Sequence, residues 1–213
     1  MRPTLLFRHG WAFDAGLWDA VVARLGGFRC LVEDRGYFGA ANEPVVDGPH
    51  VVVGHSQGAM RAPAETSGAC LGLVAINGFD CFAARDGFPG VPLRVIDRMI
   101  ARLGASAADV VAQFRQRCGA EPGGAPIGIG RLAADLARLR DGDGRVACAA
   151  ADIPILSLQG GADPILPPAM RAAVFAGARQ VERHERAGAD HLLPLRDPAY
   201  CAAMIAGFAE IVA

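Results

Sequence analysis

The feature that most constrains this chain is an apolar stretch that leads into a serine between two glycines. The segment "PHVVVGHSQGAM" (residues 49–60) has three consecutive valines followed by the G-x-S-x-G sequence "GHSQG", with the serine at position 56. Glycines on both sides leave room for a sharp turn from a buried strand into a helix, which would raise the serine hydroxyl above the sheet. The segment therefore predicts a strand, a turn and a helix. Either the glycines only make the turn, or they present Ser56 as a nucleophile.

Short apolar runs alternate with helical patterns along the chain, which is typical of a parallel sheet covered by helices. The third run is continuously apolar, as in a strand covered on both faces, whereas the sixth is polar enough to lie near an edge. Helical spacing predicts helices over residues 14–27 and 198–213. We expect strands at residues 4–10, 28–36, 50–56, 70–78, 153–161 and 179–188.

Residues 79–150 have a different pattern, because helical spacing replaces the alternation of strands and helices. Three helices are expected there, at 91–104, 106–119 and 129–142. Three helices inserted at one point of a sheet form a cap. We therefore expect one α/β domain with a core of residues 1–78 and 151–213, and a helical lid of residues 79–150.

A serine hydroxyl needs a base to take its proton, and the base needs an acidic residue to orient it. In a sheet with this kind of serine turn, the three residues follow in the order serine, acid, histidine. Asp163 comes just after the expected fifth strand and His191 just after the sixth. Carboxyl ends of parallel strands share one edge of the sheet, so we expect Ser56, Asp163 and His191 to meet there as a catalytic triad.

Other residues compete for these roles. Asp190 adjoins His191 and is the rival orienting acid, although adjacent loop residues rarely direct their side chains at each other. Asp163 precedes Pro164 and could simply begin a turn. His184 is expected to be structural inside the sixth strand, and His50 to cap the start of the third.

Attack by a serine also requires N–H donors for the oxyanion that forms. One donor should be the backbone N–H of Gln57, which follows the nucleophile, and the other should come from the loop after the first strand. In that loop, "HGWAFD", the N–H of Trp11 is the candidate, and His9 is expected to stabilise the turn by hydrogen bonding. The Trp11 ring forms either a pocket wall or ordinary packing.

Composition excludes several classes of partner. The formal net charge is −1, which argues against nucleic acid and anionic membranes as partners. No apolar run reaches the length of a membrane span. The six cysteines show no metal-type spacing, and "MRPTLLFRHG" lacks the apolar segment of a signal peptide, so we expect a cytoplasmic protein without metal or organic cofactor.

The motifs "HGW", "GHSQG", "GADPILP" and "GADHLLP" resemble those of the α/β-hydrolase superfamily over nearly the whole chain. The closer resemblance is to the pimeloyl-ACP methyl ester carboxylesterases of biotin synthesis. "HGWAFDAGLW" is similar to their oxyanion segment, and residues 77–119 are similar to their lid. The chain departs from the usual pattern in having few residues before "HGW" and no helix pattern in residues 37–49, as in the compact members of that group.

This resemblance implies a compact α/β-hydrolase fold and a serine carboxylesterase that hydrolyses the methyl ester of pimeloyl-ACP. The alternatives are another small-acyl esterase or thioesterase, with the same triad, and a non-catalytic binding protein of the same fold. Acyl carrier protein, the implied partner, is acidic, so the lid should present positive charge. Arginines recur at helical spacing there and either dock the carrier or form a solvated face next to Asp97: Arg94, Arg98, Arg102, Arg115 and Arg117.

Overall fold

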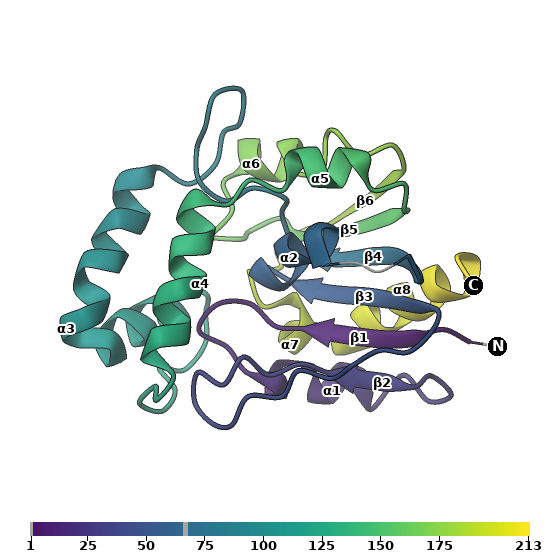
Figure 1. The fold of residues 1–213 in the computed structure, drawn as a ribbon, viewed down its shortest axis with the longest axis horizontal. Coiled ribbons are helices and arrows are strands. Elements are labelled where there is room, and N and C mark those ends of the chain that lie inside the picture. The colour runs from purple at the N-terminus through teal and green to yellow at the C-terminus, as the bar shows by residue number, and fades with distance from the viewer. Residues whose placement is uncertain (1, 66–67) are drawn as a thin grey trace.

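The computed structural model describes residues 2–65 and 68–213. Its centre is a parallel sheet of six strands in the order β2-β1-β3-β4-β5-β6, which confirms the expected class (Figure 1). Each expected strand is present within its predicted range and shorter than it, most of all β2, which keeps three of nine residues. The strands are β1 (Thr4–Arg8), β2 (Cys30–Val32), β3 (His50–His55), β4 (Cys70–Ile76), β5 (Ile155–Gly160) and β6 (Val181–Arg186).

Burial along the strands follows the sequence pattern. Every residue of β1, β3 and β5 is buried, because these strands have neighbours on both sides and helices on both faces. β6 lies at one edge, and most of its residues are exposed. The charged sequence "VERHER" therefore suits the position that the polar pattern predicted.

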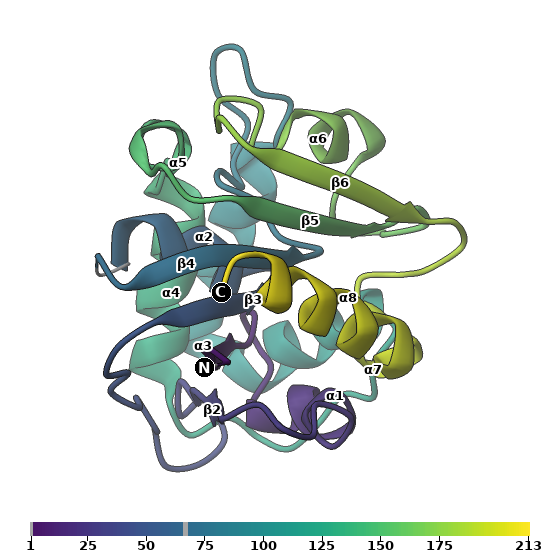
Figure 2. The same ribbon diagram turned by 90° about the vertical axis from the view of Figure 1, so that its right-hand side faces the viewer.

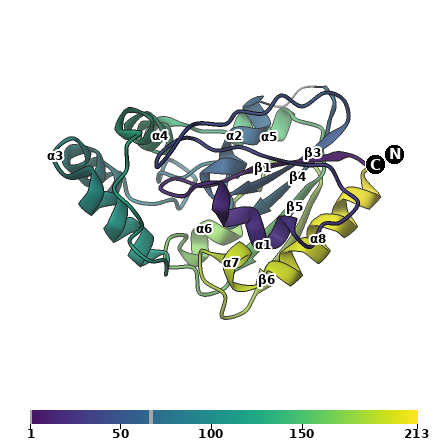
Figure 3. The same cartoon turned by 90° about the horizontal axis from the view of Figure 1, so that it is seen from below.

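Helices cover both faces of the sheet. Figure 3 shows α1 (Asp19–Val22), α7 (Leu193–Arg196) and α8 (Pro198–Ile211) on one side of the strands, and α2 (Gln57–Glu65) and α5 (Arg145–Ala150) on the other. In Figure 2, α8 passes in front of the sheet, and α6 (Pro168–Ala173) lies beside β6.

The expected helix over residues 14–27 is shorter than its pattern. A 3₁₀ turn, η1 (Ala15–Trp18), begins at the Asp14 cap, whose side chain accepts from the N–H of Gly16. α1 follows for four residues and then tightens into i→i+3 bonds before Gly27, whose φ is +91°. The helix is thus truncated by a left-handed glycine.

The lid region contains two long helices at the carboxyl end of the sheet, where the arrows of β1 and β3 point (Figure 1). The first two expected helices are the two segments of α3 (Leu93–Arg117), which are separated by non-helical backbone at Ser106, where φ is −146° and ψ is 52°. α4 (Ile129–Asp141) matches the third. The division into a core and a lid at residues 78 and 151 remains a proposal. Within the described residues, no helix is both long and apolar enough to cross a membrane.

The turn between β3 and α2 depends on the absence of side chains at its glycines. A Cβ on Gly58 would lie 2.2 Å from the carbonyl oxygen of Arg8, and a Cβ on Gly54 would lie 2.4 Å from the backbone nitrogen of Ala59. Neither approach is possible for a real Cβ, so α2 must shift away from β1 and β3 if either glycine is replaced.

Gly58→Ala is expected to destabilise the protein by about 3 kcal/mol, because the new methyl group overlaps backbone atoms of β1. Chemical denaturation followed by circular dichroism measures this change. Gly130→Ala is the matched control, since a Cβ there meets nothing within 4 Å, and it should be neutral or stabilising by up to about 1 kcal/mol. Equal stabilities for the two variants would contradict the close packing at the turn.

Candidate active site

The loops that follow β3, β5 and β6 bring Ser56, Asp163 and His191 together. His191 Nε2 lies 3.2 Å from Ser56 Oγ, and His191 Nδ1 lies 2.7 Å from Asp163 Oδ2. With the proton on Nδ1, the imidazole donates to the carboxylate and accepts from the hydroxyl. The carboxyl ends of parallel strands thus place three residues, far apart in the sequence, within hydrogen-bonding distance.

Ser56 itself is held in a strained backbone conformation. It has a φ of +52°, in the left-handed region that residues other than glycine rarely adopt. Its N–H donates to the carbonyl oxygen of Ile76 at the end of β4, and its own carbonyl accepts from Ala59 N–H. Gly10 is close by, because a Cβ there would lie 2.9 Å from Ser56 Cβ. Such strain at a reactive position persists only where the surroundings enforce it.

The carboxylate of Asp163 is fully occupied by donors. Its Oδ1 accepts from the N–H groups of Ile165 (2.7 Å) and Leu166 (3.1 Å), while its Oδ2 accepts from His191 and from Asn77 Nδ2 (2.8 Å). Burial acts to raise the pKa of Asp163, but the charge and hydrogen bond of His191 and the two backbone donors outweigh it. The net pKa is lowered. The acid therefore stays ionised beside the imidazole.

Asn77 is a member of this site that the sequence reasoning missed. It follows β4 directly, is fully buried and has a φ of +45°. Besides Asp163, its Nδ2 contacts the carbonyl oxygen of Asp190 at 3.3 Å. The available signal was its position, since a polar residue directly after a strand next to β3 and β5 lies at the same edge as the triad.

His55, immediately before the serine, was also missed. Its Nε2 lies 2.8 Å from the carbonyl oxygen of His191, and the two rings are 4.9 Å apart. Complete burial is the largest cause that lowers the pKa of His55, to about 3, and the nearby His191 is the second cause. The neutral ring therefore donates through Nε2–H. It fixes the backbone that carries His191.

The competing residues lie elsewhere. The carboxylate of Asp190 accepts from Leu192 N–H (2.8 Å) and Arg196 Nε (3.0 Å), and so turns away from the imidazole of His191. His184 pairs with Glu182 on the exposed side of β6, and His50 contacts the carbonyl oxygen of Gly48 at the start of β3.

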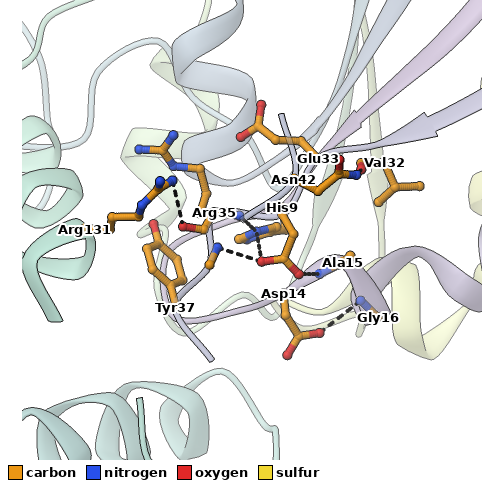
Figure 4. A network of polar contacts seen from close by, with 12 residues as sticks. His9, Asp14, Ala15, Gly16, Val32, Glu33, Arg35, Tyr37, Asn42 and Arg131 are labelled. Carbon is orange, nitrogen blue, oxygen red and sulfur yellow. Dashed lines mark hydrogen bonds and ion pairs between the residues drawn. The ribbon is translucent and has the colours of Figure 1, made fainter. Parts of the chain in front are cut away.

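His9 binds both sides of the turn after β1. Its Nδ1–H donates to the carbonyl oxygen of Gly10 (2.9 Å), and its Nε2 accepts from Arg35 N–H (2.9 Å). The close-up in Figure 4 shows His9 beside Arg35 and Tyr37. Burial lowers the pKa of His9, which keeps the ring neutral and suited to both bonds. His9 therefore stabilises the turn after β1 by hydrogen bonding, as the sequence predicted.

The two expected oxyanion donors flank the serine. Gln57 begins α2, and Trp11 lies in the turn closed by the bond from Phe13 N–H to the carbonyl oxygen of Gly10 (3.3 Å). Among residues 2–65 and 68–213, neither the Trp11 nor the Gln57 backbone N–H has a hydrogen-bond acceptor. Free N–H groups on both sides of a serine hydroxyl suit the stabilisation of an oxyanion.

A cavity of about 740 Å³ lies between this edge of the sheet and the lid helices. Trp11 and Asp163 belong to its wall, and Ser56 keeps an exposed fraction of 6%. The Trp11 ring does both things that were expected of it: it lines the cavity, and it packs edge-on against Phe114 with 5.0 Å between ring centres. Apolar side chains from α3 and α4 also line it: Val95, Ile96, Met99, Val110, Leu136 and Leu139.

Four of the five lid arginines line this cavity, namely Arg94, Arg98, Arg102 and Arg117. Arg115 does not. Its guanidinium donates to the carbonyl oxygens of Ala12 and Glu121 (both 2.9 Å) and lies over the Phe13 ring, 4.8 Å from the ring centre. The Arg115 side chain was expected to face a partner. It contacts other residues of the protein instead, namely the aromatic face of Phe13 and the carbonyl oxygen of Ala12.

Comparisons with known proteins agree with this architecture. No protein-family model matches the chain. A pimeloyl-[acyl-carrier protein] methyl ester esterase of Yersinia pseudotuberculosis serotype O:1b is 26% identical over 97% of this chain and 93% of its own length, and one of Yersinia pestis has the same values.

Solved structures give the same fold. An esterase from Thermogutta terrifontis superposes with a TM-score of 0.77 at 21% identity, over 99% of this chain and 90% of its own. An esterase from Exiguobacterium antarcticum has a TM-score of 0.82 at 15% identity, over 98% and 92%. A bromoperoxidase from Bacillus anthracis has 0.81 at 15%, over 99% and 92%. The chain therefore has the α/β-hydrolase fold.

The buried histidine next to Ser56 predicts acid sensitivity. His55 takes up a proton near pH 6.5 in the unfolded chain but only near pH 3 in the folded one, so the unfolded state binds more protons between these values. Stability should fall as the pH is lowered from 6.5 towards 3, by at most about 1.4 kcal/mol per pH unit for this group.

His55→Gln should reduce that slope, whereas His184→Gln, which alters an exposed histidine, should leave it unchanged. Denaturant unfolding at pH 7, 6, 5 and 4 measures it. A slope that is the same in wild type and His55→Gln would show that His55 is not the group responsible.

Proposed function

We propose that this chain, which has the α/β-hydrolase fold, is a serine carboxylesterase with Ser56 as nucleophile, His191 as base and Asp163 as orienting acid. The observation that carries the proposal is the continuous hydrogen-bonded path from Ser56 Oγ through the imidazole to the Asp163 carboxylate, at 3.2 and 2.7 Å. The relatives and structural neighbours named as esterases support a carboxylic ester hydrolase.

In the proposed reaction, Ser56 Oγ attacks the ester carbonyl while His191 Nε2 takes the hydroxyl proton. The oxyanion accepts from the N–H groups of Trp11 and Gln57, and Asp163 stabilises the imidazolium. The alcohol leaves with the proton of His191, giving the acyl-enzyme. Water, deprotonated by His191, then attacks the same carbonyl and releases the acid with a free Ser56 hydroxyl.

For the substrate, we propose the methyl ester of pimeloyl-ACP, which would place the enzyme in biotin synthesis. The names of the Yersinia relatives support this, and so does the cavity beside the triad, whose mainly apolar wall suits an alkyl chain. Acyl carrier protein would be the macromolecular partner.

The charges on α3 support docking of an acidic carrier. Arg94, Arg98 and Arg102 are exposed, and within the described residues no carboxylate forms an ion pair with any of them. Asp97, which could have neutralised the row, pairs instead with Arg140 of α4. The positive row therefore stays available at the mouth of the cavity, together with Arg117. Arg115 is left out of this surface.

Ser56→Ala should lower turnover of a small methyl ester by at least about 10³-fold and leave the melting temperature nearly unchanged, because only a hydroxyl is removed. A fluorophosphonate should add one covalent group to the wild type and none to Ser56→Ala, as seen by intact-protein mass spectrometry. Ser106→Ala, at the bend of α3, should be labelled like the wild type. Failure of the folded wild type to label or turn over would favour a binding protein of this fold.

Arg98→Glu should raise KM about tenfold for a methyl ester carried on acyl carrier protein and change KM for a small free ester much less, since the exposed arginine row attracts the acidic carrier. Arg179→Glu is the matched control: it reverses an exposed arginine that precedes β6, at the opposite end of the strands from the cavity. Equal loss on both substrates would rule out docking. A preference for thioesters over methyl esters would favour the thioesterase alternative.

A further inference from the structure

We propose that α4 is a fixed part of the active site that positions the oxyanion hole, through hydrogen bonds from the side chains of Trp11 and Gln57. This inference rests on the proposed function, which assigns the oxyanion to the backbone N–H groups of the same two residues. Trp11 Nε1–H donates to the carbonyl oxygen of Leu132 (2.9 Å), and Gln57 Nε2–H donates to the carbonyl oxygen of Asp135 (2.7 Å). Both bonds are buried.

The geometry of a helix makes these two bonds a spacer. Leu132 and Asp135 are three residues apart in α4, so they lie on the same face, about 4.5 Å apart along the axis. Each carbonyl has a second lone pair available besides its helical bond. The loop after β1 and the start of α2 already pack against each other at Gly58 and Arg8, and α4 in addition fixes the spacing of the Trp11 and Gln57 side chains.

α4 can serve as a spacer because the core holds it from another side. The buried carboxylate of Asp135 accepts two bonds from the Arg35 guanidinium (2.9 and 3.0 Å) and one from Tyr37 Oη (2.6 Å). Arg131 also donates to the carbonyl oxygen of Arg35, and Figure 4 shows Arg131 beside Arg35 and Tyr37. The helix is therefore anchored by Arg35 and Tyr37 in addition to its bonds with Trp11 and Gln57.

The start of α4 is tied to the same loop. The N–H groups of Ile127 and Gly128 both donate to the carbonyl oxygen of Tyr37, at 2.8 and 3.0 Å. A Cβ on Gly128 would lie only 2.2 Å from the carbonyl oxygen of Gly36, so the backbones are in direct contact. Residues 33–49 connect β2 to β3 without a helix, and this segment thus holds the start of α4 in place.

Arg115 of α3 makes a further contact with the loop after β1, which carries Trp11 and is called the oxyanion loop below. It donates to the carbonyl oxygen of Ala12, the residue after Trp11, whose φ is +63°. A residue in this left-handed conformation needs its neighbours to hold it. The inward position of Arg115 is thereby explained, because it stabilises the turn that presents the Trp11 N–H.

The functional consequence is preorganisation. Oxyanion donors accelerate a reaction because they are already in place when charge develops, and small displacements of catalytic groups are costly. Loss of a side-chain tie should therefore weaken binding of the transition state more than binding of the substrate. That difference appears as a lower kcat with little change in KM.

Gln57→Met tests this directly, because methionine has a similar length and no N–H donor. We expect kcat for a small methyl ester to fall about tenfold. KM should stay within about twofold of the wild-type value, and the melting temperature within about 2 °C. Affinity for a trifluoromethyl ketone, which forms an oxyanion on Ser56, should fall in parallel. Trp11→Phe, combined with Gln57→Met, should lower kcat further.

Gln159→Met is the matched control, because Gln159 Nε2–H is also a buried donor to a backbone carbonyl oxygen, that of Gly78 (2.9 Å), and has no bond to α4 among the described residues. It should lower the melting temperature and leave kcat within twofold. An active wild type whose Gln57→Met variant keeps its kcat and its ketone affinity would overturn the inference alone. Equal kcat losses in Gln57→Met and Gln159→Met would also overturn it, whereas a wild type without turnover would contradict the proposed function itself.

Discussion

The site depends on a buried carboxylate that has four donors. Asp163 is held by two backbone N–H groups of its own loop, by Asn77 after β4 and by His191 after β6. A buried charge is tolerated only when it is compensated in this way, and here the compensation comes from three segments of the chain. The carboxylate therefore connects three loops at one edge of the sheet and fixes the imidazole that faces Ser56. The strained serine turn and the cavity wall are built around that arrangement.

Local pattern predicted most of the helices and strands, because apolar periodicity and glycine turns are properties of short segments. "HVVVGHSQG" predicted a strand, a turn and a helix, and the structure has all three. What failed depends on packing between distant segments. Arg115 looked like a surface charge on its helix. Its guanidinium instead contacts the carbonyl oxygen of Ala12 and the ring of Phe13, about a hundred residues away in the sequence. The break between the first two lid helices, by contrast, was predicted from local pattern and is found at Ser106.

The two lid helices differ in how they relate to the sheet. α4 receives buried hydrogen bonds from Trp11, Gln57, Arg35 and Tyr37, so the core and α4 form one packed unit. α3 presents an arginine row beside the cavity and touches the oxyanion loop through Arg115. On the proposed function, α4 would serve the reaction and α3 would serve recognition of the carrier. Sequence alone could not separate these roles, since both helices have the same amphipathic pattern.

The most direct measurement is a crystal structure of the protein after reaction with a methyl-ester-like phosphonate. The account predicts phosphorus bonded to Ser56 Oγ, with the phosphonyl oxygen about 2.7–3.1 Å from both the Trp11 and Gln57 backbone nitrogens. It also predicts His191 Nε2 facing the alkoxy oxygen that remains on phosphorus while Nδ1 keeps its bond to Asp163. An adduct on another residue, or a phosphonyl oxygen directed away from both nitrogens, would contradict it.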